Sequence, residues 1–245
     1  MGATVYDEHV AAYLAFVDDA LAAKPSLFRE VLRVIEQLLG GRLTDSRLVD
    51  LACGEGYLSR FLAPLGPKEI LGVDLSSALV EEARRRTFAT NVSFRIEDAQ
   101  ELPTVDNGSV DVVVSQMAMM DIADHLAVFR CARRVLRPNG AFVFSLLHPC
   151  FESPFWPPGE EHFLTNADGV ATANVVRWYA SEGYWKAEGA GVRGFLGSYH
   201  RTLSTYVNDL VGNGFRLEQL AEPVVPGGGL FSQVPRVLIV AAEAI

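Results

Sequence analysis

The chain has 245 residues, of which 49% are hydrophobic and 21% are charged, as is typical of one large globular α/β domain with an insertion. Its net charge of −9 and isoelectric point of about 5.1 disfavour binding to phosphate backbones and anionic bilayers, so we expect no nucleic-acid or membrane partner. The N-terminus shows no signal-peptide pattern, which predicts a cytoplasmic protein. The three cysteines lack metal-binding spacing, and we predict no metal.

The chain begins with two segments of helical periodicity and then changes to short apolar runs that alternate with helical segments. Helices are predicted at 6–20, 26–39, 56–65, 76–87 and 124–136. Strands are predicted at 47–52, 69–74, 93–96, 110–115 and 141–147. Strands that alternate with helices indicate a doubly wound, Rossmann-like α/β fold with a mostly parallel sheet.

The end of the chain departs from this alternation. A helix at 202–211 is followed by strands at 215–221 and 236–242, with only a Pro- and Gly-rich link between them. That link suits an antiparallel closing hairpin. We therefore predict a seven-stranded, mostly parallel sheet whose last strand is antiparallel, preceded by N-terminal helices.

Residues 148–199 hold ten aromatic side chains, including all three tryptophans, among scattered Pro and Gly. We interpret this segment as an inserted cap, with a small hairpin across 175–179 and 184–187. The predicted division is 1–147 for the N-terminal helices and cofactor-binding core, 148–199 for the cap and 200–245 for the rest of the core. The cap aromatics could form a small core of their own or the walls of an acceptor pocket.

The most informative motif is a glycine turn that follows the first predicted strand. Gly54 and Gly56 let the backbone turn sharply and approach a ligand closely. Asp74 follows 20 positions after Gly54, where such folds place a carboxylate that binds a ribose diol. Asp74 could also be a plain helix-opening turn residue, but its place beside the glycine turn indicates an adenosine-type cofactor.

A dinucleotide fingerprint would need a third glycine, and Ser59 stands at that position. This argues against a nicotinamide-dependent oxidoreductase, which stays an alternative. Further motifs follow strands three and four and precede strand five: Glu97-Asp98-Ala99, Ser115-Gln116 and Arg137-Pro-Asn-Gly140. With the glycine turn, they make residues 44–147 resemble the class I S-adenosylmethionine-dependent methyltransferases, in their small-molecule branch.

The resemblance implies a set of cofactor-binding residues. The backbone around Ala52, Cys53 and Gly54 would hold the amino-acid end of S-adenosylmethionine, and of the product S-adenosylhomocysteine. Asp74 would bind the ribose and Leu75 would pack on the adenine, beside Asp98 and Ala99. Ser115 and Gln116 would line the sulfonium side, and Tyr6 and Tyr13 of an opening helix would reach the carboxylate end.

One position departs from the family pattern, which often has glycine where this chain has Ala52. The methyl group of alanine is tolerable there if φ is negative.

The predicted catalytic residues are two histidines, because imidazole is suited to proton transfer near neutral pH. His148 directly follows strand five, and His200 leads into the last helix. Alternatively, His148 closes the strand by bonding backbone and His200 caps the helix.

The predicted acceptor-binding residues come from the loop after strand four, from the cap and from the start of the segment after it: Met117, Asp121, Trp178, Tyr184, Tyr199 and Arg201. Asp121 could instead only start a helix. The hypothesis is methyl transfer from S-adenosylmethionine to oxygen, nitrogen or carbon of a small, partly apolar or aromatic metabolite. A non-catalytic S-adenosylmethionine-binding protein is the remaining alternative.

Overall fold

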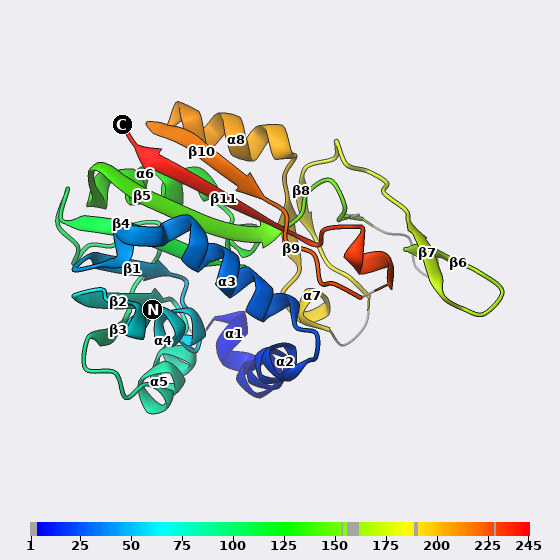
Figure 1. Ribbon diagram of the computed structural model, residues 1–245, viewed down its shortest axis with the longest axis horizontal. Coiled ribbons are helices and arrows are strands. Elements are labelled where there is room, and N and C mark those ends of the chain that lie inside the picture. Colours follow the sequence, from blue (N-terminus) through cyan, green and yellow to red (C-terminus); the bar gives the residue numbers. More distant parts are fainter. Residues whose placement is uncertain (1–3, 153, 156–161, 189–190, 228) are drawn as a thin grey trace.

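The computed structural model describes residues 4–152, 154–155, 162–188, 191–227 and 229–245. A seven-stranded sheet of order β10-β11-β5-β4-β1-β2-β3 runs through its centre (Figure 1). Its strands are β1 (Arg47–Leu51), β2 (Glu69–Asp74), β3 (Val92–Ile96), β4 (Val110–Gln116), β5 (Leu136–Leu147), β10 (Phe215–Ala221) and β11 (Val237–Ala244). The first five are parallel, and β11 pairs antiparallel with both β5 and β10. The predicted sheet is thereby confirmed.

Helices flank the sheet on both faces. They are α1 (Val5–Glu8), α2 (Val10–Ala22), α3 (Leu27–Leu39), α4 (Tyr57–Leu62), α5 (Ser77–Arg86), α6 (His125–Val135), α7 (Val192–Phe195) and α8 (Leu203–Gly212). Short 3-10 turns occur at η1 (Gly40–Leu43), η2 (Ala63–Leu65), η3 (Met119–Asp121) and η4 (Gly229–Ser232). Several helices begin at an oxygen-bearing side chain that accepts a backbone N–H three residues later, namely Ser26, Ser76, Asp124 and Thr202.

The alternation of side chains along the central strands builds two cores. On β4, Val112 and Val114 pack with the apolar face of α3, whereas Val113 packs with α6 on the other side. Figure 1 shows α3 crossing in front of the sheet. Because both faces of the central strands are buried, their sequences are nearly continuous apolar runs.

The structure corrects two of the predicted elements. Strand β5 begins at Leu136, not at residue 141, because Leu136 pairs with Val110 before a shift of register. In the cap, the predicted hairpin is wrong: β8 (Gly183–Trp185) pairs with β9 (Ser198–His200), and residues 175–179 form no strand. A second small sheet pairs β6 (Phe163–Thr165) with β7 (Ala171–Asn174).

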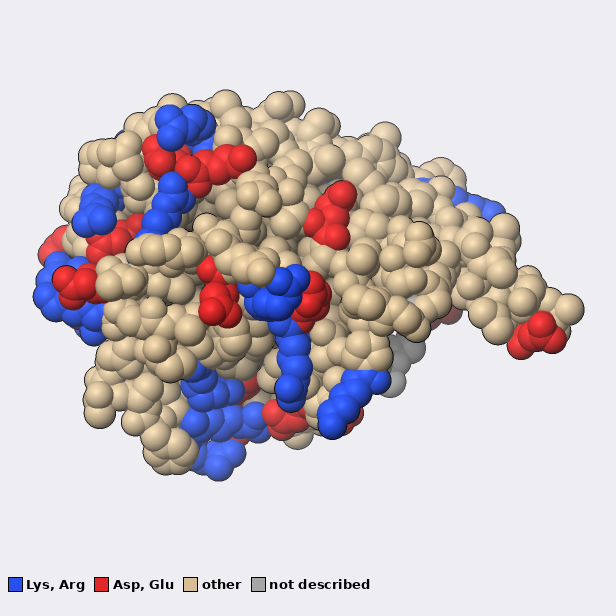
Figure 2. Space-filling view, in the orientation of Figure 1, with Lys and Arg blue, Asp and Glu red and all other residues tan. Residues whose placement is uncertain are grey.

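The cap lies beyond the carboxyl ends of the parallel strands, with α7 close to α2 and the β6–β7 hairpin projecting from the body (Figure 1). Basic and acidic side chains are interspersed on the face that Figure 2 shows, mostly over the α/β core. Within the described parts of the chain, no helix is both long and apolar enough to cross a bilayer. The division of the chain at 147/148 and 199/200 stays a prediction.

Candidate active site

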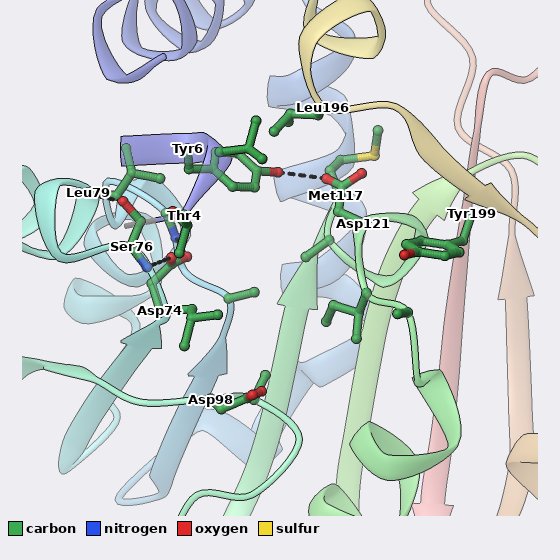
Figure 3. Close-up of a pocket in the computed structure, with 18 of the residues that line it drawn as sticks. Thr4, Tyr6, Asp74, Ser76, Leu79, Asp98, Met117, Asp121, Leu196 and Tyr199 are labelled. Atoms are coloured by element: carbon green, nitrogen blue, oxygen red, sulfur yellow. Dashed lines mark hydrogen bonds between the residues drawn. The ribbon is translucent and has the colours of Figure 1, made fainter. Parts of the chain in front are cut away.

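A cavity of about 390 Å³ opens at the carboxyl ends of β1, β2, β3 and β4. Figure 3 shows Asp74 on one side, Tyr6 and Asp121 above, Asp98 below and Tyr199 on the opposite side. In open α/β sheets this edge is where ligands bind. Its size falls within the range of small-molecule and cofactor sites.

The turn after β1 holds two glycines, and the first of them, Gly54, lines this cavity. Gly54 and Gly56 have φ angles of 56° and 81°. A Cβ atom on Gly54 would lie 2.8 Å from the Tyr13 hydroxyl, and one on Gly56 would lie 2.7 Å from the Phe94 ring. Both contacts are too short for a side chain at either position, so packing against Tyr13 and Phe94 requires glycine there.

Ala52 also lines the cavity, and its φ angle is 52°. The condition on which alanine would be tolerated at this position, a negative φ, is therefore not met. A left-handed conformation costs a residue with a Cβ atom about 1–2 kcal/mol. Strain of this kind is concentrated at ligand sites.

Ala52→Gly should relieve this strain. Part of the gain in stability is offset, because glycine loses more conformational entropy than alanine on folding. We expect the free energy of unfolding to rise by about 0.5–1 kcal/mol. Urea denaturation of the two chains measures the difference. A variant that is less stable than the native chain would show that the left-handed turn is not strained.

Asp74 ends β2 and is held by the turn beneath the cavity. One carboxylate oxygen accepts the Gly54 N–H at 2.8 Å and the other accepts the Ser76 N–H at 2.9 Å. Burial raises the pKa of Asp74 to about 6, against the lowering effect of these two bonds. Each oxygen keeps a second acceptor direction, so the carboxylate can still receive the two hydroxyls of a ribose.

The predicted adenine side is formed by Leu75, Asp98 and Ala99, all of which line the cavity. Leu75 is 41% exposed, so an apolar surface is available to a flat ring. The Asp98 carboxylate accepts the backbone N–H of Gln100 at 2.9 Å and its side-chain amide at 3.0 Å. These bonds fix the direction of the carboxylate beside the space where an amino group would lie.

At the end of β4 the two predicted residues differ. Gln116 lines the cavity, and among the described residues neither its amide nitrogen nor its amide oxygen has a hydrogen-bond partner. A buried primary amide without partners is costly, which indicates that a polar ligand completes it. Ser115 is fully buried and is not among the described lining residues, nor is Cys53.

The N-terminal helices cover the cavity, and both predicted tyrosines line it. The Tyr6 hydroxyl donates to Asp121 at 2.7 Å, and the Tyr6 ring meets the Tyr13 ring edge-on with centroids 5.3 Å apart. Asp121 also forms a charged pair with Arg193 of α7. This bridge links the first helix, the loop after β4 and the cap.

Helix α1 is tied to α5 as well. The Asp7 carboxylate accepts the Ser76 hydroxyl at 2.7 Å and the Ala78 N–H at 3.0 Å. The carboxylate therefore satisfies a free donor at the helix N-terminus and holds α1 over Asp74.

The predicted acceptor residues divide into two groups. Met117, Asp121, Tyr184 and Tyr199 line the cavity, while Trp178 and Arg201 are not among the described lining residues. Trp178 is 53% exposed. The buried Arg201 guanidinium donates to the carbonyl oxygens of Ile122 and Ala123 at 2.9 and 2.7 Å, so it positions the loop after β4.

Neither predicted catalytic histidine is among the described residues that line the large cavity. His148 is 2% exposed, its Nε2 lies 2.7 Å from Glu222, and its Nδ1 accepts the Cys150 N–H. His200 contacts the Tyr179 carbonyl oxygen through Nε2 at 2.8 Å, and burial lowers its pKa. In this arrangement neither ring is placed to act on an acceptor in the cavity.

Several lining residues were missed from the sequence. They are Thr4, Val5, Ser76, Leu79, Glu97, Gln100, Ala118, Ile122, Ala123, Leu196, Gly197 and Ser198. Ser76 and Glu97 adjoin motif residues, and their positions were a usable signal. The cap residues carry no local pattern that indicates which way they face.

Asp50 lies on β1 and is 1% exposed. One of its oxygens accepts the Ser59 hydroxyl at 2.7 Å, and the other has no partner among the described residues. Burial raises the pKa of Asp50 to about 7, with a further contribution from the charge of Asp74. Asp50 therefore holds a proton well above the ordinary range of an aspartate.

Because the pKa of Asp50 is higher in the folded chain than its ordinary value of 3.8, folding favours the protonated form. The resulting stabilisation is complete below that ordinary value and is lost as the pH rises towards 7. Asp50→Asn keeps the shape of the neutral acid but does not titrate. Between pH 4 and pH 7 the free energy of unfolding should therefore fall less in this variant than in the native chain, and the two losses should differ by up to a few kcal/mol. Urea denaturation across this range tests it, and parallel curves for the two chains would contradict it.

Comparison with known proteins bears on the same residues. A family described as "Methyltransferase domain" matches residues 49–144. A ubiquinone biosynthesis O-methyltransferase of Xanthomonas oryzae is 31% identical over 150 residues, which cover 56% of this chain and 61% of that enzyme. A malonyl-[acyl-carrier protein] O-methyltransferase of Legionella pneumophila is 34% identical over 48% of this chain and 42% of that enzyme. The chain thus spans less than two thirds of each of these two relatives.

Among solved structures, an S-adenosylmethionine-dependent methyltransferase from Mesorhizobium loti superposes with a TM-score of 0.73. It is 27% identical, and the alignment covers 87% of this chain and 95% of that one. The match extends beyond the core motifs to most of the fold. It favours the methyltransferase interpretation over the nicotinamide-dependent oxidoreductase that the glycine turn had left open.

Proposed function

Because this chain belongs to the class I S-adenosylmethionine-dependent methyltransferases and uses that cofactor, we propose that it methylates a small, partly apolar or aromatic metabolite held against the cap. The observation that carries this is the shape of the cavity at the sheet edge. It runs from Asp74 and Asp98 to Met117 and Asp121, where cap residues Tyr184 and Tyr199 close it.

The residues present fit the cofactor on two independent features. Gly54 lines the cavity with a backbone that carries no side chain, and the Tyr13 hydroxyl lies next to it, so both could meet the amino-acid end. The amide of Gln116 offers a donor and an acceptor that no described residue uses. Asp74 would hold the ribose, and Leu75 and Asp98 would hold the adenine, as the positions of these residues along the cavity support.

Bound S-adenosylmethionine supplies an electrophilic methyl group whose sulfonium is a good leaving group. The protein then has two tasks, to align the acceptor for in-line approach and to exclude water. Helix α1 serves the second task, because Asp7 and Tyr6 fasten it over the cavity from both sides. Burial raises the pKa of Tyr6 and Tyr13, so both phenols stay protonated. The Tyr6 hydroxyl donates to Asp121, and the Tyr13 hydroxyl can donate to a ligand.

By their names, both relatives are O-methyltransferases, one in ubiquinone biosynthesis and one that acts on malonyl-[acyl-carrier protein]. They support transfer to oxygen as the first reaction to test here. The experiment is to incubate the purified chain with S-adenosylmethionine labelled on its methyl group and a panel of small phenols, amines and carboxylic acids. We expect label to enter a phenol or another apolar small molecule, and label that enters no member of the panel would overturn the proposal.

A further inference from the structure

A second cavity, of about 280 Å³, lies between the N-terminal helices and the cap. It shares a wall with the large cavity, made of four residues that line both: Tyr6, Tyr13, Met117 and Asp121. Two of these, Met117 and Asp121, follow β4 and lie on the opposite side of the large cavity from Asp74 (Figure 3). The second cavity therefore adjoins the part of the site where the transferred group would be delivered.

One side of the second cavity is aromatic. Phe16 and Phe28 meet edge-on with ring centroids 5.7 Å apart, and Phe28 stacks on Tyr57 at 6.0 Å with 21° between the planes. Val17 and Val192 add aliphatic surface from α2 and α7. Such a lining favours a flat, apolar ligand, since aromatic rings pack well in offset and edge-on arrangements.

The other side carries a partly buried carboxylate, that of Glu152. Glu152 is 16% exposed at its side chain, and its nearest described charge is Arg236 at 3.8 Å, beyond hydrogen-bond distance. Burial raises the pKa of this carboxyl. Arg236 itself lies over the rings of Phe163 and Phe231, with its guanidinium 6.0 and 5.1 Å from their centroids. Glu152 thus lines this cavity with a carboxylate that keeps acceptor capacity.

The charges that line the cavity restrict the ligand further. Arg193 is neutralised by Asp121, and Arg236 lies beside Glu152. Exposed Glu188 adds one more negative charge at the rim. The sum is slightly negative, so an anionic ligand is disfavoured and a neutral or cationic one is favoured.

We propose that this second cavity is the acceptor subsite, and that it takes an aromatic alcohol or amine whose hydrogen-bond donor meets Glu152. This rests on the proposed function, because it assigns a place to the acceptor of that reaction. Glu152 is not proposed as a general base. Its role is to bind the acceptor through a hydrogen bond and thereby to select it.

The test uses the full chain, saturated with S-adenosylhomocysteine and labelled with ¹³C on its Val, Leu and Ile methyl groups. Leu79 and Ile122 line only the large cavity among the described contacts, whereas Val17 and Val192 line only the second. Phenol, benzylamine, toluene and benzoate serve as probes at millimolar concentrations. We expect phenol and benzylamine to shift the Val17 and Val192 signals, toluene to bind more weakly and benzoate not to bind.

Glu152→Gln removes the charge and keeps the shape, so phenol affinity should fall about fivefold while toluene affinity stays the same. Glu81→Gln changes an exposed acid that is not among the described lining residues of either cavity, and we expect this control to leave phenol affinity unchanged. Phenol shifts confined to Ile122 and Leu79, no shift with any probe, or equal effects of the two variants would each overturn the proposal. Failure of the proposed function is a separate result, because S-adenosylhomocysteine would then not shift the methyl signals of Leu79.

Discussion

Replacing Asp74 with alanine should weaken the binding of S-adenosylhomocysteine by about 100-fold or more. The ribose would lose two hydrogen bonds to a carboxylate, each worth about 1.5–3 kcal/mol. Calorimetric titration of the native chain and of Asp74→Ala measures the difference. Asp50→Asn, a change at a buried acid that is not among the described lining residues, is the control and should alter the affinity little.

Asp74 also accepts backbone N–H groups from Gly54 and Ser76, so its removal disturbs the turn as well as the ligand. A comparison of adenosine with 2′,3′-dideoxyadenosine separates these effects. The native chain should strongly prefer adenosine, and Asp74→Ala should lose that preference even if both ligands bind weakly. An equal preference in both chains would show that another group holds the ribose.

The second large effect is expected at the bridge between Asp121 and Arg193. These side chains are only 10% and 19% exposed, and Asp121 also accepts the Tyr6 hydroxyl. Asp121→Ala would leave a mostly buried guanidinium without its charge partner, which costs about 3–5 kcal/mol in such settings. Urea denaturation should therefore show a loss of about 3 kcal/mol in the free energy of unfolding.

The matched control for this bridge removes both charges. In the double variant Asp121→Leu with Arg193→Met, no buried charge is left unpaired, so much of the lost stability should return. Two results would contradict this account: a loss of unfolding free energy in the double variant equal to the sum of the two single losses, or a loss below about 0.5 kcal/mol in Asp121→Ala. Either would show that the pair contributes as little to stability as a typical surface ion pair.

The parts of the fold that the sequence predicted are those with strong local signals. The run that ends at Ala52, the glycine turn and the serine cap at Ser76 each indicate a buried strand, a tight turn or a helix start within a few residues. Asp74 and Asp98 were predicted to face one edge because the carboxyl ends of parallel strands meet there, and both line the cavity.

The parts that the sequence did not predict depend on distant partners. Tyr184 lies in a strand as expected, but β8 pairs with β9 rather than with residues 175–179, and neither segment carries a turn signal that would decide between them. His148 follows strand five as predicted, yet its ring contacts Glu222, 74 residues away. Only tertiary packing determines that its nitrogens are already engaged.

The second cavity could not be predicted for a similar reason. Its walls come from α1, α2, α3, α4 and α7, from the loop after β4 and the segment after β5, and from Arg236, and no motif joins these parts in the sequence. Glu152 carries no local pattern that would separate it from a solvated acid. Its significance comes from burial beside Arg236 and from the apolar surfaces opposite it.

The most direct measurement is a crystal structure of the chain with S-adenosylhomocysteine. The account predicts that both ribose hydroxyls lie within hydrogen-bond distance of the Asp74 carboxylate, with the adenine between Leu75 and Asp98 and the amino-acid end beside Gly54 and Tyr13. An adenosyl group bound elsewhere, or a ribose that makes no contact with Asp74, would contradict it.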